Sequence, residues 1–293
     1  MHQDIMELKR QYDNVPIPKE LDFVVHQSLK KGLRKLMFKE SKGIIAIAAI
    51  FILFIGGINI SPKMANALEE IPVIKSLVHV FTFREYKHSA GTFNTDIKVP
   101  ALDGLENKTL QNSLNQKYLE ENQKLYEQFM SDMKEMKDKG TDGHLGVNSG
   151  YVVKTDNDRI LSIGRYVVNT VGSSSTKFKY DTVDKKNQIL ITLPSLFKED
   201  NYIDIISDNI KAQMLEQMKQ DPKKTYWISG YSNSPIQAFA KIAKNQNFYI
   251  NNEGKLVISF DKYEVAPGSM GVVEFIIPTE VISDILVSHE YIQ

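Results

Sequence analysis

The chain has 293 residues, of which 42% are hydrophobic and 25% are charged, a composition typical of an ordinary globular protein. Its formal net charge of zero gives no basic excess of the kind that nucleic-acid-binding proteins show, and the absence of cysteine excludes disulfides, thiolate catalysis and cysteine-ligated zinc. The charge is unevenly distributed: residues 1–42 contain nine Lys and Arg against six Asp and Glu, so they carry +3 and the remainder carries −3.

Residues 1–42 are predicted to form a short helical segment. Residues 2–12 have a helical pattern, the prolines in residues 15–18 interrupt it, and a second helix is expected to follow with Pro18 in its first turn. An apolar stripe at helical spacing marks this second helix and consists of Leu21, Val24, Val25 and Leu29. About 40 residues cannot bury a core of their own, so we expect the stripe to contact a partner protein, with anionic lipid as the alternative.

A single membrane-spanning helix is predicted at residues 43–60. These eighteen residues contain no charge, and at ~1.5 Å per residue they match the hydrocarbon thickness of a bilayer. The positive-inside rule sets the orientation, because the flank before the span is basic: Lys30, Lys31, Arg34, Lys35, Lys39 and Lys42, opposed only by Glu40. We therefore expect residues 1–42 to be cytoplasmic and residues 61–293 to be extracellular.

A small-x-small motif follows the span, within a juxtamembrane segment assigned to residues 61–90. Ala65 and Ala67 have the spacing that signal peptidase requires. Removal as an ordinary signal peptide is disfavoured, because some 42 residues precede the apolar stretch. Cleavage under regulation and a chance match both remain open on spacing alone.

The remainder, residues 91–293, is predicted to be an α+β domain with an antiparallel sheet and two long helices. Before it, residues 71–81 suggest a short helix and residues 82–86 a strand. The first long helix covers residues 107–137, whose apolar face is interrupted by one polar turn at Glu121 and Asn122. The second long helix begins near Ile203 and takes Asp200 as its candidate N-cap.

Strands are predicted between and after the two long helices. β-branched and aromatic residues separated by turn signals indicate strands at residues 151–156, 160–171, 177–183, 188–193, 247–250, 255–263 and 272–277. Hairpin turns are expected at residues 184–187 and 251–254, and a short final helix at residues 279–287. Runs of strands separated by helices, with hairpins, are typical of the α+β class.

The residues do not indicate an enzyme, a metal site or a cofactor. The sequence contains no nucleophile elbow, zinc-protease motif, phosphate loop or dinucleotide fingerprint. Asp261 and Glu264 fall in a predicted strand at a spacing that points them to opposite faces, which disfavours a shared acid–base site. Between two apolar strands, residues 263–271 form a loop that Pro267, Gly268 and Gly271 make rigid; it is either a plain connection or a tip that enters a partner's cleft.

The chain resembles the RsiV family of membrane-bound anti-sigma factors, which restrain the extracytoplasmic-function sigma factor sigma-V and sense lysozyme. The likeness extends nearly end to end. It is found in residues 12–22, 71–74, 95–102, 193–200, 256–260 and 263–268, and these matches occur in the same order.

The resemblance implies a mechanism. The cytoplasmic segment would hold the sigma factor, and lysozyme would bind the extracellular domain. Signal peptidase would then cut after Ala67, and an intramembrane site-2 protease would cut within the span. A serine, a proline and a tyrosine of the family's loops would occupy the substrate groove of lysozyme. In this chain they match Ser174 and Pro267, whereas Ser269 stands at the tyrosine position, which puts one aromatic contact in doubt.

The residues also allow a reading from another class. A membrane-anchored extracellular cell-wall enzyme, or a lysozyme inhibitor without a sigma-factor partner, would share the span and the outer domain. The two readings differ in whether residues 1–42 capture a sigma factor.

Overall fold

The computed structural model describes residues 78–140, 143–230 and 238–293, all of which belong to one compact unit, Pro72–Gln293. The predicted cytoplasmic stripe, the span at residues 43–60 and the motif at Ala65 and Ala67 lie outside the described residues. Within the described part of the chain, no helix is both long enough and apolar enough to span a bilayer.

The largest element is a six-stranded sheet in which the strands follow one another in chain order. Its strands are β1 (His79–Ala90), β2 (Phe93–Asp103), β3 (Leu145–Asp156), β4 (Ile160–Val171), β5 (Ser173–Asp184) and β6 (Ile189–Ile191). All neighbours are antiparallel except β2 and β3, which are parallel. The expectation of a purely antiparallel sheet was therefore wrong, because a helical crossover connects β2 to β3 and returns the chain to the same end of the sheet.

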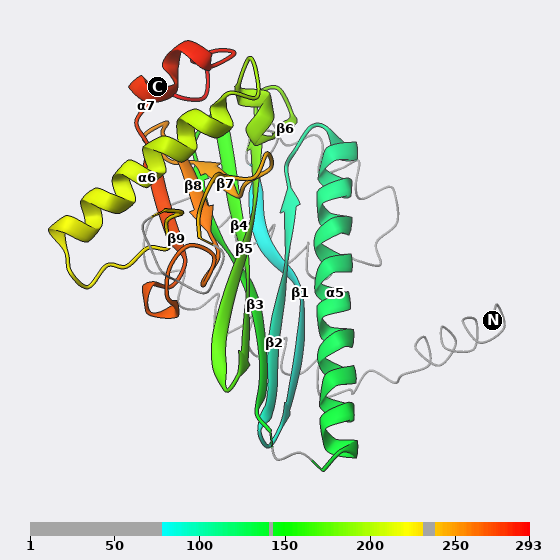
Figure 1. The fold of residues 1–293 in the computed structure, drawn as a ribbon. Coiled ribbons are helices and arrows are strands. Elements are labelled where there is room, and N and C mark those ends of the chain that lie inside the picture. The colour runs from blue at the N-terminus through cyan, green and yellow to red at the C-terminus, as the bar shows by residue number, and fades with distance from the viewer. Residues whose placement is uncertain (1–77, 141–142, 231–237) are drawn as a thin grey trace, which may run out of the picture. The chain divides into compact units, whose positions relative to one another are not determined.

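That crossover is α5 (Lys108–Asp138), which covers one face of the sheet (Figure 1) and confirms the helix predicted at residues 107–137. Its N-cap is Asn107, whose side chain accepts a hydrogen bond from the backbone N–H of Leu110 at 3.1 Å. The apolar face packs on the strands in two clusters, which include the buried side chains of Leu114, Tyr118, Phe129 and Met133.

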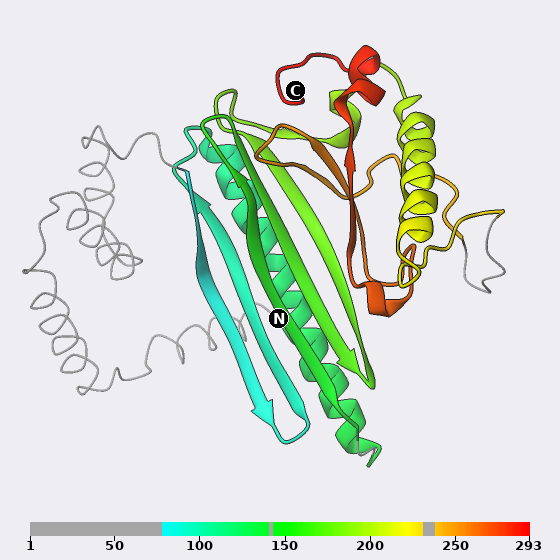
Figure 2. The same ribbon diagram turned by 90° about the vertical axis from the view of Figure 1, so that its left-hand side faces the viewer.

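The opposite face of the large sheet carries a second, three-stranded antiparallel sheet, and a helix lies beyond it (Figures 1 and 2). Its strands are β7 (Phe248–Ile250), β8 (Leu256–Phe260) and β9 (Val273–Ile277). Thr155 of β3 donates a hydrogen bond to the carbonyl of Ile250 at 2.5 Å and so joins the two sheets. The outer helix, α6 (Tyr202–Gln220), buries Ile206, Ile210 and Met214 in the cluster that contains the small sheet.

Short helical turns complete the fold. They are η1 (Leu193–Leu196), η2 (Gly268–Met270), α7 (Thr279–Ile282) and η3 (Ser283–Ile285), so the predicted final helix is real but divides into two turns. The hairpins at residues 184–187 and 251–254 are confirmed.

Three local predictions were wrong. Residues 79–81 belong to β1 and not to a helix, and β2 together with the first half of β3 had no predicted strand. Asp200 is not the N-cap of α6: Asn201 holds that position, and the carboxylate of Asp200 instead accepts from Lys244 Nζ at 2.6 Å. That ion pair lies 44 positions apart in sequence, so no local pattern could indicate it.

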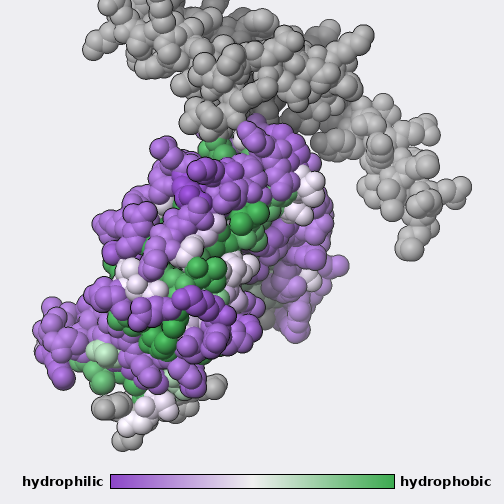
Figure 3. All heavy atoms as spheres, turned by 90° about the horizontal axis from the view of Figure 1, so that it is seen from above, coloured by the Kyte–Doolittle hydropathy of each residue, from purple (hydrophilic) through white to green (hydrophobic). Residues whose placement is uncertain are grey.

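The two ends of the large sheet differ in what they carry. The start of β1 and the β5–β6 turn lie at one end of the sheet, which we call the root. The strand register shows this, because His79 pairs with Asp103, Gly146 with Thr170 and Ile160 with Asp184. The β4–β5 hairpin lies at the other end. Figure 3 looks down on the root, where hydrophobic atoms appear among hydrophilic ones.

Candidate binding tip

The β4–β5 hairpin and the loop between β8 and β9 lie side by side at the end of the sheet away from the root. Lys262 Nζ donates to the hydroxyl of Ser174 at 2.9 Å, and the hydroxyls of Ser173 and Tyr263 are 3.2 Å apart. A backbone bond from Lys262 N to the carbonyl of Thr176, 3.0 Å long, fixes the two loops together. We call residues 171–175 and 262–271 the tip; it joins the predicted Ser174 to the loop that carries Pro267 and Ser269.

The loop has the rigid turn that its sequence predicts. Pro267 precedes the short helical turn η2 with a φ of −58°, and Met270 N donates to the carbonyl of Pro267 at 2.9 Å. Gly271 follows with a φ of 68°, a conformation that glycine adopts without strain. Ser269 is exposed, whereas the preceding Val265 and Ala266 are buried in the core. The turn is thus presented to solvent on a well-packed base.

Tyr263 is the member of the tip that sequence reasoning missed. Its backbone has a φ of 74°, which is rare for a bulky residue, and its side chain is 42% exposed. The ring lies against Gly268 so closely that a Cβ at that position would overlap it. The one available signal was that a large aromatic opens a loop rich in Gly and Pro; nothing local indicates its left-handed backbone.

The two carboxylates near the loop hold it in place. β8 ends at Phe260, so Asp261 and Glu264 lie in the loop and not in a strand, contrary to the prediction. Asp261 accepts from the backbone N–H of Phe178 at 2.8 Å, and Glu264 accepts from the N–H of Asp261 at 2.7 Å. Burial raises the pKa of Asp261, although the hydrogen bond from Phe178 and the charge of Lys177 oppose the shift. Both groups therefore anchor the loop.

Beneath the tip, a buried ionic cluster attaches α5 to the sheet. Arg165 of β4 and Asp181 of β5 have side chains only 7% and 4% exposed, and Arg165 Nη2 lies 3.0 Å from the carboxylate of Asp181. Arg165 also pairs with Glu121 of α5, and its guanidinium lies 4.3 Å from the ring centroid of Tyr118. The polar turn in the apolar face of α5 is the place where these charges meet.

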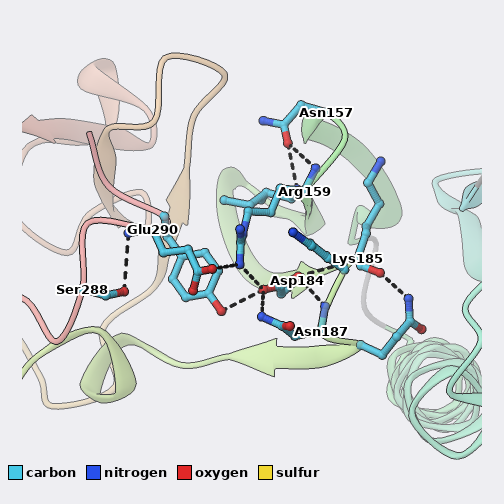
Figure 4. A network of polar contacts seen from close by, with 11 residues as sticks. Asn157, Arg159, Asp184, Lys185, Asn187, Ser288 and Glu290 are labelled. Carbon is cyan, nitrogen blue, oxygen red and sulfur yellow. Dashed lines mark hydrogen bonds and ion pairs between the residues drawn. The ribbon is translucent and has the colours of Figure 1, made fainter.

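At the root, the chain's last residues close over a second network (Figure 4). The side chain of Asp184 is fully buried; it accepts from the backbone N–H of Asn187 at 2.8 Å and from the hydroxyl of Tyr291 at 2.8 Å. Arg159 joins the cluster by pairing with Glu290. Burial disfavours the charged form of Asp184. The pKa of Asp184 is nevertheless lowered, because its carboxylate accepts hydrogen bonds from Asn187, Tyr291 and Lys186 and lies near the charge of Arg159.

No group of three or more His, Asp or Glu side chains within residues 78–140, 143–230 and 238–293 has the arrangement of a metal site. The predicted sigma-binding residues and the predicted cleavage motif fall before residue 78, so the geometry bears on the tip alone.

Comparison with known proteins gives matches along the whole chain. A family model described as "Protein of unknown function (DUF3298)" matches residues 194–280, and one described as "Domain of unknown function (DUF4179)" matches residues 36–142. The protein "Anti-sigma-V factor RsiV" of Bacillus subtilis (strain 168) is 47% identical over 293 residues, which is 100% of both chains.

Two crystal structures of DUF3298 family proteins share the fold. The one from Bacteroides fragilis has a TM-score of 0.54 at 15% identity and covers 73% of this chain and 95% of its own. The one from Pseudomonas aeruginosa has a TM-score of 0.51 at 14% identity and covers 75% of this chain and 99% of its own. These likenesses show that the same α+β fold occurs in proteins of low sequence identity.

Proposed function

This chain belongs to the family of the anti-sigma-V factor RsiV, and from that premise we propose that it is a membrane-bound anti-sigma factor that releases a sigma-V-type factor when lysozyme binds its outer domain. The observation that carries the proposal is the 47% identity over the full length of both chains. A match of that extent covers the inner segment, the apolar stretch and the outer domain together.

The inner segment would restrain the sigma factor. The stripe of Leu21, Val24, Val25 and Leu29 is apolar on one side of a predicted helix, and so short a segment must bury such a stripe against something else. A sigma factor held there would be kept from RNA polymerase. The basic flank of residues 30–42 supports a cytoplasmic location, where the sigma factor is found.

Release would proceed by two cuts. Ala65 and Ala67 have the spacing of a signal-peptidase site just beyond the proposed span, so the first cut would separate the outer domain from its anchor. An intramembrane site-2 protease would then cut within residues 43–60 and free the inner segment with its sigma factor.

The outer domain would receive lysozyme at the tip. Ser174 and Pro267, which the resemblance assigns to lysozyme binding, lie on two loops joined by the Lys262–Ser174 hydrogen bond of 2.9 Å. The loops are rigid, so little conformational freedom is lost when they enter a groove. Ser269, at the third position, is exposed on the same turn.

The sigma-factor role is tested with the full-length chain and one charge in its stripe. Co-expressed wild-type chain should co-purify with a sigma-V-type factor and silence a reporter that depends on it. Val25→Asp should lose both effects, because a carboxylate in an apolar contact is costly to bury. Gln27→Asp, in the same predicted helix but off the stripe, is the matched control. If the wild-type chain neither binds nor silences the sigma factor, the anti-sigma proposal fails and a cell-wall enzyme or a lysozyme inhibitor becomes the better reading.

A further inference from the structure

We propose that Tyr263 is the aromatic contact by which the tip recognises its protein partner. The inference rests on the proposed binding of lysozyme and adds a residue to it. In this chain Ser269 stands where the resemblance expects a tyrosine, so the loop lacks its expected aromatic group. Tyr263 provides one on the same loop, six positions earlier.

Its position makes Tyr263 central to the tip. The hydroxyl reaches Ser173 on the β4–β5 hairpin, 3.2 Å away, and the hydroxyl end of the ring also lies against Gly268. Tyr263 therefore touches both loops. Tyr263 is 42% exposed, so it remains available to a partner while its hydroxyl end is held by both loops.

Its backbone indicates that the position is constrained. A φ of 74° costs a bulky side chain free energy that the surrounding structure must offset, and such residues concentrate at functional sites. Two flanking carboxylates provide that restraint. Asp261, two residues before Tyr263, and Glu264, the residue after it, both accept hydrogen bonds from backbone N–H groups. The ring is thus pre-oriented before any partner arrives.

The composition around the ring fits the recognition of a protein surface. Tyrosine set among serine and glycine is the composition by which antibody loops bind proteins, with the aromatic as a rigid anchor. The tip has that composition in Ser173, Ser174, Gly268 and Ser269. The ammonium of Lys262 lies 5.2 Å from the ring centroid and donates to Ser174, so it helps to hold the ring beside the serines of the hairpin.

Four variants of the full-length chain in detergent test whether the ring of Tyr263, and not its neighbours, makes the contact. The probe is purified c-type lysozyme. Affinity is measured by biolayer interferometry. Tyr263→Asn removes the ring but tolerates a positive φ, so it should fold and should bind about 30-fold more weakly. Gly268→Ala, which displaces the ring, should bind about tenfold more weakly. Tyr263→Phe keeps the ring and should stay within about threefold of wild type. Phe83→Asn, at a side chain 44% exposed on β1, is the matched control and should leave affinity unchanged.

Thermal unfolding of each variant shows that the fold is retained. Equal affinity of wild type and Tyr263→Asn would overturn the inference and leave the proposed function standing. Equal loss in Tyr263→Phe and Tyr263→Asn would also overturn it, because the hydroxyl and not the ring would then be the contact. If the wild-type chain does not bind lysozyme, the proposed function itself fails, and the role of Tyr263 fails with it.

Discussion

Arg165 illustrates how a single buried charge can hold two elements together. Its side chain is 7% exposed and lies between Asp181 on the neighbouring strand and Glu121 on α5. Buried ion pairs contribute little against an apolar alternative, but removing one partner leaves the other charge uncompensated. The contact between α5 and the sheet should therefore be sensitive to this residue.

Arg165→Met should lower the free energy of unfolding by about 3 kcal/mol, because it leaves the buried Asp181 with only the half-exposed Lys117, 2.9 Å away, as its cation partner. Urea denaturation measures the change. Lys179→Met is the control: that lysine contacts the same Glu121 at 3.0 Å but has a side chain 65% exposed, so its loss should cost about 1 kcal/mol or less. Similar losses of unfolding free energy in both variants would show that the contribution of Arg165 to stability does not depend on its burial.

Asp184 makes stability depend on pH. Its pKa is lower in the folded protein than in the unfolded chain, so its contribution is present above the unfolded pKa of about 3.9 and is lost as pH falls through the folded pKa. Asp184→Asn should therefore flatten the acid side of the stability profile, measured by urea denaturation between pH 7 and pH 3. Asp208→Asn, at a side chain 77% exposed, should leave the profile as in wild type. Parallel profiles for wild type and Asp184→Asn would contradict the assignment.

Some residues could be assigned from sequence and others could not. The pattern of α5 predicts that a polar turn at Glu121 and Asn122 interrupts its apolar face. It cannot predict that Ser149 donates to Asn122 at 2.7 Å or that Arg165 pairs with Glu121, because those partners lie on strands distant in sequence. At the tip, Ser174 and the loop of Pro267 were likewise predicted separately. The contact from Lys262 to Ser174 that joins them could not be predicted, because these residues lie far apart in sequence.

Elements were predicted well wherever their pattern is local. β4 has the bounds expected, residues 160–171, and the hairpin of β7 and β8 was expected from its turn residues. β2 was missed because Pro100 interrupts its pattern; in the structure Pro100 pairs with Thr82 beside an irregularity in β1, which is where a sheet tolerates proline. The parallel pairing of β2 with β3 depends on how α5 crosses the sheet, which no local pattern encodes.

The C-terminal segment ties the two sheets together. The hydroxyl of Tyr291 donates to Asp184 at the β5–β6 turn, and the backbone N–H of Gln293 donates to Gly254 in the β7–β8 turn at 3.0 Å. Between them, Ile292 is 1% exposed in the core that contains the small sheet and α6. This segment therefore belongs to the folded core.

Ile292→Ala should lower the free energy of unfolding by about 2–5 kcal/mol, because it leaves a cavity between the two sheets. Val287→Ala, at a side chain 59% exposed, is the matched control and should stay within about 0.5 kcal/mol of wild type. Chemical denaturation of both variants compares them. An Ile292→Ala variant as stable as Val287→Ala would show that the segment can leave the core freely.

At the scale of the whole molecule, the proposed function connects parts far apart in the chain. The proposed sigma-binding stripe, the proposed span and the proposed cleavage motif precede residue 78, whereas the tip belongs to the described domain. Recognition by lysozyme would have to alter access to a site more than a hundred residues before Ser174 in sequence. In the proposed mechanism, the cut at Ala67 would be the step that connects lysozyme binding to release of the sigma factor.

Ala67→Trp should block the lysozyme-triggered shortening of the chain, because signal peptidase accepts only small residues at that position. Immunoblots of intact cells with and without lysozyme follow the shortening. Asn66→Trp, at the unconstrained middle position, is the matched control and should be cut as in wild type. Normal shortening of Ala67→Trp would refute the assigned cut, whatever the affinity of the tip.

The placement of the tip opposite the root has a steric consequence. β4 and β5 each run twelve residues between the two ends, a span of roughly 40 Å at ~3.3 Å per residue. A globular ligand seated on the far extremity would leave unobstructed the side where the backbone enters at Val78. Under the proposed function, receptor, ligand and processing protease would then form a ternary assembly, and the bound ligand would not need to dissociate before cleavage.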